Sequence, residues 1–206
     1  MLEFSVGKTK IKISFLFLAF CTICSLCYNR CFFTMALFAS LLHEMAHILM
    51  LYFVGESAEK LDFVPQGIAL VRKGKILSYK SEILILSAGC ILNFILFLIF
   101  YFCCQTLSLK LFGVVNLGLG LFNALPIGAL DGGRILKILL KNMFFAQKAE
   151  LICKIVSVFI VVVFILLGIY LVLNGRRNVS LLLTCIYLTS MLLFRNYDWI
   201  FYKIII

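Results

Sequence analysis

The sequence predicts an all-α polytopic membrane protein with about six transmembrane helices, and its composition leads to that prediction. Of the 206 residues, 64% are hydrophobic and only 14% are charged, whereas soluble domains contain about 45–50% apolar and about 25% charged residues. The mean hydropathy is +1.14, and only two prolines interrupt the chain. This composition excludes a water-soluble globule, a disordered chain and a secreted domain held together by disulfides.

Six apolar stretches are candidate membrane spans, because a helix needs about 20 apolar residues to cross about 30 Å of hydrocarbon. They are residues 11–28, 31–54, 83–106, 111–125, 151–174 and 179–196. The basic N-terminal segment resembles a signal peptide, but no small-residue cleavage site follows it, so 11–28 is interpreted as the first span. The fourth stretch runs into the Gly/Pro-rich residues 117–133, and such an interrupted helix must face protein or a water-filled cavity.

The one sizeable loop, residues 55–82, connects the second and third spans. Two apolar, strand-like runs, 63–71 and 75–79, lie on either side of a basic Arg-Lys-Gly-Lys segment. They predict a short membrane-associated hairpin. An amphipathic loop bound to anionic lipid through its lysines is the alternative.

The distribution of basic residues predicts the orientation of the chain in the membrane. With a cytoplasmic N-terminus, 15 of the 19 Lys and Arg residues fall in cytoplasmic segments and four on the other side. This bias predicts that both termini are cytoplasmic. Arg176 and Arg177 lie on the opposite side and leave the orientation of the last helical hairpin open. The net charge of +10 is scattered over the loops, so no nucleic-acid partner is expected.

The two histidines of the chain lie four residues apart in the sequence His43-Glu44-Met45-Ala46-His47. Positions i and i+4 of a helix share a face, so both imidazoles can bind one metal ion. Ionisable residues inside an apolar helix are costly and point to a functional site. The alternative is a polar cluster that joins helices by hydrogen bonds.

A catalytic zinc site needs a third protein ligand and leaves its fourth position for water. No further histidine is present, so the third ligand must be an aspartate, a glutamate or a cysteine. Asp131 is the best candidate, because it ends a segment in which Pro126 and several glycines break the helix and allow close backbone approach. The alternative is that Asp131 only caps a helix that begins near Gly132.

These motifs resemble those of the site-2 protease family of intramembrane zinc metalloproteases. That family pairs HExxH with an NxxPxxxLDGG-type segment, and the present sequence has HEMAH at 43–47 and NALPIGALDGG at 123–133. Residues 88–93, with Cys90 at a position where proline is usual, resemble the family's Gly-Pro-x-x-Asn stretch. The short length and the lack of a PDZ insertion are most similar to the sporulation branch, that of stage IV sporulation protein FB. We therefore expect one integral-membrane metalloprotease domain, 1–206, with a motif-bearing core of about 31–141.

The resemblance implies a zinc endopeptidase in a bacterial inner or cell membrane. His43, His47 and Asp131 would bind one Zn²⁺ per chain, and Glu44 would transfer the proton of the attacking water to the leaving amine. Neither a CBS domain nor a PDZ domain is expected. A different HExxH peptidase of membranes and a zinc transporter are further alternatives. The former usually recruits a later glutamate as its third ligand, and a transporter would need several polar ligands along a path, whereas this sequence has one polar cluster.

The resemblance also implies a protein substrate that is embedded in or tethered to the membrane and is cut near the cytoplasmic face. The pro-form of a sporulation sigma factor is one candidate substrate, and inhibitory membrane proteins are expected partners besides the lipid bilayer. Asn93 and Asn123 would hold the substrate backbone or developing negative charge, with ordinary interhelical hydrogen bonding as the alternative. A catalytically inactive scaffold that binds transmembrane helices, a pseudoprotease, is the competing function.

Overall fold

The computed structural model describes most of the chain between residues 30 and 174 and short pieces outside that range. The described residues are 2–6, 9–13, 30–55, 58–64, 67–72, 77–174, 184–186, 188, 189 and 192. The chain forms two compact units, of which the first extends to Leu121 and the second begins at Phe122.

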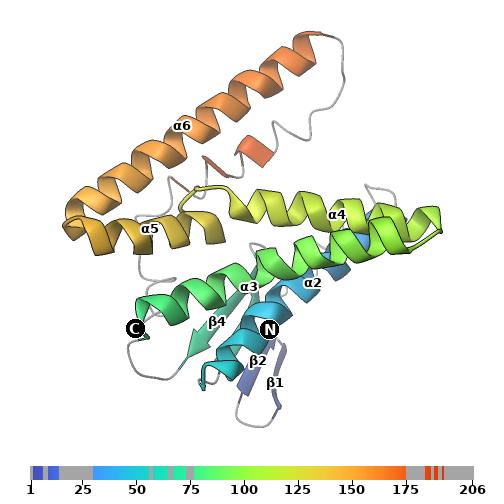
Figure 1. Cartoon of the computed structure of the whole chain (residues 1–206), viewed down its shortest axis with the longest axis horizontal. Coiled ribbons are helices and arrows are strands. Elements are labelled where there is room, and N and C mark those ends of the chain that lie inside the picture. Colours follow the sequence, from blue (N-terminus) through green and yellow to red (C-terminus); the bar gives the residue numbers. More distant parts are fainter. Residues whose placement is uncertain are drawn as a thin grey trace. The chain divides into compact units, whose positions relative to one another are not determined.

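Four helices of the described residues are long and apolar enough to cross a membrane (Figure 1). They are α2 (Arg30–Phe53), α3 (Tyr79–Leu98) with its continuation η1 (Ile99–Cys103), α4 (Leu107–Ala124) and α6 (Ala146–Leu173). These helices confirm the second to fifth predicted spans. The chain is therefore an integral membrane protein.

The starts of these helices differ from the sequence prediction where polar residues join the helix. α3 begins at Tyr79 rather than at residue 83, because the side chain of Ser78 accepts a hydrogen bond from the N–H of Ser81 at 3.3 Å and caps the first turn. The short helix α5 (Asp131–Met143) lies between the fourth and fifth predicted spans and has charged residues on one side. The length of the apolar stretches alone predicts neither the early start of α3 nor the short helix α5.

The first and last predicted spans are not confirmed. Strand β2 (Thr9–Ile13) occupies the first three residues of the predicted span 11–28, and residues 14–29 lie outside the described part of the chain. Within 179–196, residues 184–186, 188, 189 and 192 are helical, and the others lie outside the described part. The prediction of six spans thus holds for four.

A four-stranded sheet of order β1-β2-β3-β4 accompanies the helices of the first unit (Figure 1). β1 (Leu2–Val6) pairs antiparallel with β2, β2 pairs parallel with β3 (Ala58–Val64), and β3 pairs antiparallel with β4 (Gly67–Arg72). Sequence reasoning missed the N-terminal hairpin. Its signal is the alternation of apolar and polar residues in both strands, which is typical of strands rather than of a basic flank of a membrane helix.

The predicted hairpin in the loop 55–82 exists, but its predicted strand bounds are wrong. Val64 pairs with Gly67, so the connection falls at residues 65 and 66, within the predicted strand 63–71. The second predicted strand, 75–79, ends at the first residue of α3, and residues 73–76 lie outside the described part.

Small residues bring α4 close to α3 within the first unit. A Cβ atom on Gly113 would lie 3.2 Å from the backbone nitrogen of Tyr101, and one on Gly120 would lie 3.2 Å from Cβ of Asn93. Helices in membranes pack closely through such small residues. As a result, α4 covers the stretch of α3 that carries Asn93.

The second unit has its own apolar core, in which Ile127, Leu130, Val161 and Leu188 are buried together. Helices α5 and α6 pack against each other. An ion pair of 2.7 Å between Lys137 Nζ and Glu150 Oε1 joins them. This core holds the segment that leads into α5.

Candidate metal centre

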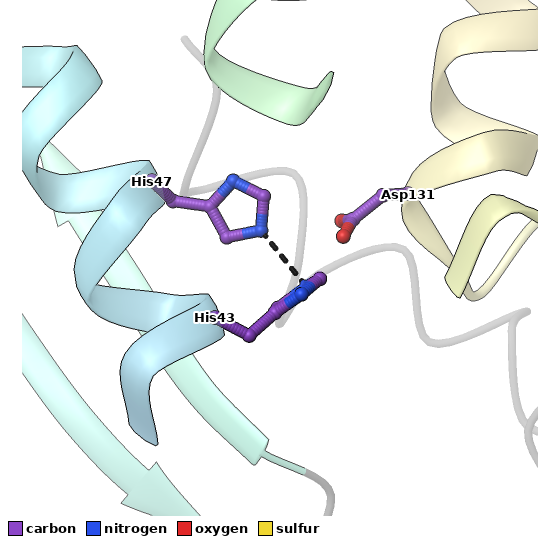
Figure 2. Close-up of side chains that lie close together, drawn as sticks. All are labelled: His43, His47 and Asp131. Atoms are coloured by element: carbon purple, nitrogen blue, oxygen red, sulfur yellow. Dashed lines mark hydrogen bonds between the residues drawn. The ribbon is translucent and has the colours of Figure 1, made fainter. Parts of the chain in front are cut away.

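Helix α2 places His43 and His47 on one face, as the spacing of the motif predicts. Their side chains are 3% and 9% exposed, and their Nε2 atoms lie 3.2 Å apart (Figure 2). Met45, on another side of the helix, is 63% exposed. The two imidazoles are therefore turned inward from an otherwise apolar helix.

Helix α3 lies beside α2 and contacts both imidazoles through residues 85, 89 and 93, which are spaced four apart on one face (Figure 1). Nδ1 of His47 donates to the carbonyl oxygen of Ile85 at 2.7 Å. With its proton on Nδ1, His47 carries its lone pair on Nε2, the atom that can bind a metal. Nδ2 of Asn93 lies 3.0 Å from Nδ1 of His43.

Gly89 lets α3 approach the histidines. A Cβ atom at this position would lie 2.6 Å from Cε1 of His43 and 2.6 Å from Nε2 of His47. No real side chain fits at these distances, so the histidine pair requires glycine here. Sequence reasoning missed this role, although Gly89 and Asn93 have the same four-residue spacing as the histidines.

Asp131 is the first residue of α5 and is 9% exposed. The N-cap of this helix is Leu130, which makes no side-chain capping bond. The helix therefore begins at Asp131 rather than near Gly132, so Asp131 lies in its first turn and not at the N-cap position. Its negative charge lies in the first turn, where the helix dipole stabilises anions.

The glycines after Asp131 allow the close backbone approach that the sequence predicted. A Cβ atom on Gly132 would overlap the carbonyl oxygen of Ala124, and one on Gly133 would overlap that of Ile127. α4 ends at Ala124, so the chain folds back tightly on the end of this helix before α5 begins. The position of Asp131 depends on this tight turn.

Ser157 of α6 fixes the same turn from the other side. This serine is fully buried, its hydroxyl donates to the carbonyl of Cys153 at 2.7 Å, and its oxygen accepts from the N–H of Gly128 at 2.9 Å. Sequence reasoning missed Ser157. A single serine in an apolar helix gives no sequence signal of such a role, since serine often bonds to its own helix.

The structure groups two imidazoles and one carboxylate. The ligand atoms of His43, His47 and Asp131 all lie within 4.8 Å of one another (Figure 2). Histidine nitrogen and carboxylate oxygen are common zinc ligands, and three protein ligands with one open position are typical of catalytic sites. The donor set therefore fits a zinc ion.

The other predicted site residues, Glu44, Asn93 and Asn123, lie on α2, α3 and α4. Glu44 follows His43 on α2 and is half-buried. Asn123 is half-buried in the last turn of α4. Asn93 is 0% exposed, and its side-chain amide contacts His43, which is a candidate metal ligand.

Comparison with known proteins supports the same chemistry. Residues 105–167, which include Asp131 but not the two histidines, match Peptidase family M50. The structure is similar to that of the Site-2 Protease from Methanocaldococcus jannaschii, with a TM-score of 0.66, 23% sequence identity and 91% of each chain covered. The fold is that of a site-2 protease. No curated protein matches the chain in sequence. The match to the M50 family suggests a metalloprotease.

Proposed function

We propose that the chain is an intramembrane zinc endopeptidase that cleaves a membrane-embedded or membrane-tethered protein. The grouping of His43, His47 and Asp131 within 4.8 Å carries this proposal. Two observations support it independently, the M50 match around Asp131 and the site-2 protease fold. Catalytic zinc sites combine such a donor set with an adjacent acid or base, and Glu44 is next in the chain to His43.

In this proposal His43, His47 and Asp131 hold the zinc ion. When bound, zinc polarises the scissile carbonyl and makes a water molecule more acidic. Glu44 accepts the proton of the attacking water and then gives it to the departing amine. The apolar helices around the site limit the entry of other water molecules, which strengthens electrostatic interactions there.

A helical substrate must unwind before its peptide bond can be attacked, and the sheet offers a binding mode for the unwound segment. In the order β1-β2-β3-β4, β4 lies at an edge and pairs with β3 on one side only, within the described strands. We propose that an unwound substrate adds to this edge as a further strand. The alternative role of the loop is to bind anionic lipid.

Proline replacements along β4 distinguish these two roles. Each single proline at positions 68–71 removes one backbone N–H of β4. Where the removed N–H points away from β3, the hydrogen bonds between β3 and β4 stay intact. Strand addition predicts that one alternating pair of these variants loses turnover while it keeps its zinc. Equal turnover in all four variants would contradict strand addition.

We also propose a specific substrate and specific partners for this endopeptidase. The resemblance of the sequence to the sporulation branch supports the pro-form of a sporulation sigma factor as substrate, cut near the cytoplasmic face, and inhibitory membrane proteins as partners. Incubation of the purified protein with this pro-form and with other membrane-tethered proteins tests the assignment. Cleavage of the others but not of the sigma factor would remove the sporulation assignment and leave the protease.

Zinc content tests the proposed site without knowledge of the substrate. We expect about one zinc per wild-type chain in detergent, and sharply less in Asp131→Asn and in His43→Ala. Glu44→Gln should keep its zinc and lose cleavage. A wild-type protein that binds no added zinc would overturn the proposal and favour the pseudoprotease. Loss of zinc in His43→Ala alone would keep the protease but exclude Asp131 as a ligand.

A further inference from the structure

Helices α5 and α6 form a hairpin, and the turn between them carries a group of exposed apolar side chains (Figure 1). The exposed fractions are 74% for Met143, 45% for Phe144 and 84% for Phe145. Together with Asn142 and Lys148, these residues line an open hollow of about 360 Å³, the α5–α6 hollow. Small-ligand sites typically have volumes of about 300–1,000 Å³. The α5–α6 hollow therefore has the size of a ligand site and combines apolar contacts with two polar side chains.

The distribution of charge along α6 places this turn close to the lipid headgroups. The charged residues of α6 all lie in its first part, which ends at Lys154. Residues 155–173 of the same helix carry no charge and cover about 28 Å at about 1.5 Å per residue. This length is close to the hydrocarbon thickness of about 30 Å. The start of α6 and the turn before it therefore lie outside the hydrocarbon, beside the headgroups.

The same part of the chain carries an excess of positive charge. Residues 132–154 contain one acidic residue, Glu150, and five basic residues, which gives a net charge of +4. The basic residues are Arg134, Lys137, Lys141, Lys148 and Lys154. A cluster of about four to eight basic residues next to a transmembrane helix is typical of sites that bind anionic lipids. Positive charge beside an apolar hollow thus favours a ligand with both a negative headgroup and acyl chains.

We propose that the α5–α6 hollow binds an anionic phospholipid of the surrounding bilayer. The ammonium group of Lys148 pairs with the phosphate of the lipid, and the side chains of Phe144 and Phe145 contact its glycerol and the first part of its acyl chains. A soluble phosphate compound lacks the apolar part, and phosphatidylcholine lacks the net negative charge. The predicted orientation agrees with this ligand, because it places the turn at the cytoplasmic leaflet, where anionic lipids are common.

Lipid binding at this hollow does not depend on the proposed zinc site. None of the residues that line the hollow is a candidate metal ligand. Asp131 is the first residue of α5 and Met143 is the last, so a helix of about 18 Å separates the carboxylate from the hollow. A measurement of zinc content therefore tests the proposed function, whereas a measurement of bound lipid tests this inference.

Retention of lipid by the purified full chain tests the proposal. The protein is held on an affinity resin in neutral detergent and equilibrated with phosphatidylglycerol or phosphatidylcholine of the same acyl chains at increasing concentration. Mass spectrometry then counts the retained lipid per chain. We expect phosphatidylglycerol to bind more tightly than phosphatidylcholine. At about 1 M salt, where the Debye length falls to about 3 Å, this preference should weaken.

Two variants separate the charged contact from the apolar contact. Lys148→Gln should lower the affinity for phosphatidylglycerol by about fivefold, which corresponds to about 1 kcal/mol for one basic residue near a charged lipid. Its affinity for phosphatidylcholine should not change. Phe145→Ser should lower the affinity for both lipids and keep the preference between them. Both side chains are exposed, so neither substitution should prevent folding.

Lys110 provides a matched control. Like Lys148, it lies in the first turn of a helix that can cross a membrane, but it belongs to α4 and does not line the hollow. Lys110→Gln removes the same charge from the chain and should leave the affinity for phosphatidylglycerol unchanged. A fall equal to that of Lys148→Gln would show a general attraction between a basic protein and anionic micelles and would overturn the proposal.

Three further outcomes would also overturn the lipid site. They are equal affinity for the two lipids, normal binding of phosphatidylglycerol by Lys148→Gln, and displacement of the lipid by millimolar glycerol phosphate, which would assign the hollow to a soluble phosphate compound instead. Each of these results would leave the zinc site untouched. A wild type that selects phosphatidylglycerol but binds no zinc would overturn the proposed function and keep the lipid site.

Discussion

Replacement of Gly89 by alanine tests how closely α3 must approach the histidines. The new Cβ atom would lie 2.6 Å from both imidazoles, whereas ordinary contacts begin at 3.4 Å. To restore an ordinary contact, the imidazole rings or α3 would have to move by about 0.8 Å, the difference between 3.4 and 2.6 Å. Metal–ligand distances tolerate deviations of only about 0.2 Å. The variant should therefore lose the geometry of the metal site.

We expect the zinc affinity of Gly89→Ala to fall by at least about 100-fold, or about 2.8 kcal/mol at about 1.4 kcal/mol for each tenfold change. Overpacking of a buried contact should also cost about 1–3 kcal/mol of stability. Competition between the protein and a chelator of known affinity measures zinc binding in detergent. Thermal unfolding of the zinc-free protein measures stability separately.

Gly118 on α4 is the matched control, because a Cβ atom there would meet nothing within 4 Å. Gly118→Ala should bind zinc as the wild type does, and its helix should gain up to about 1 kcal/mol. A folded Gly89→Ala variant with wild-type zinc affinity would refute the reasoning. It would show that the histidines do not form the metal site or that α3 can withdraw at little cost.

Three further predictions concern the second unit. Ser157→Ala should lower the free energy of unfolding by about 1–3 kcal/mol in thermal unfolding, because the part-buried N–H of Gly128 loses its acceptor. As a control, Ser87→Ala removes only an exposed hydrogen bond within α3 and should change this free energy by less than about 0.5 kcal/mol. Gly133→Ala should give no folded protein in size-exclusion chromatography, since its Cβ would overlap the backbone of Ile127; a monodisperse variant would show that the turn before α5 can open. Lys137→Met should change stability by less than about 1 kcal/mol, because its partner Glu150 is largely exposed, and a larger, salt-sensitive loss would contradict this estimate.

The histidine pair was predictable from sequence because helix geometry is local. Four residues of helix bring His43 and His47 to one face whatever the rest of the chain does. The four confirmed spans were predictable for a similar reason, since apolar length decides whether a helix can cross a membrane. Their ends were less predictable, because a cap such as Ser78 extends α3 through polar residues.

The strands were the weakest part of the prediction. Period-two alternation was present in β1 and β2, but a basic segment before an apolar run is also typical of a membrane helix. In the second hairpin, apolar character suggested one strand over residues 63–71, whereas pairing shows that the chain turns within this run. Strand pairing is non-local, and composition alone does not show its register.

By itself, the sequence determined that the chain lies in a membrane, that two histidines share one helical face and that Asp131 follows a break in a helix. Each of these features depends on residues close together in the chain. Only the tertiary structure decided what surrounds the histidines, because Asn93 is 50 residues from His43 and Ile85 is 38 residues from His47. The close approach at Gly89, the hydrogen bond from His47 to the Ile85 carbonyl and the anchoring of Gly128 by Ser157 all come from packing between helices. Packing brings distant residues into contact, and no local spacing encodes those contacts.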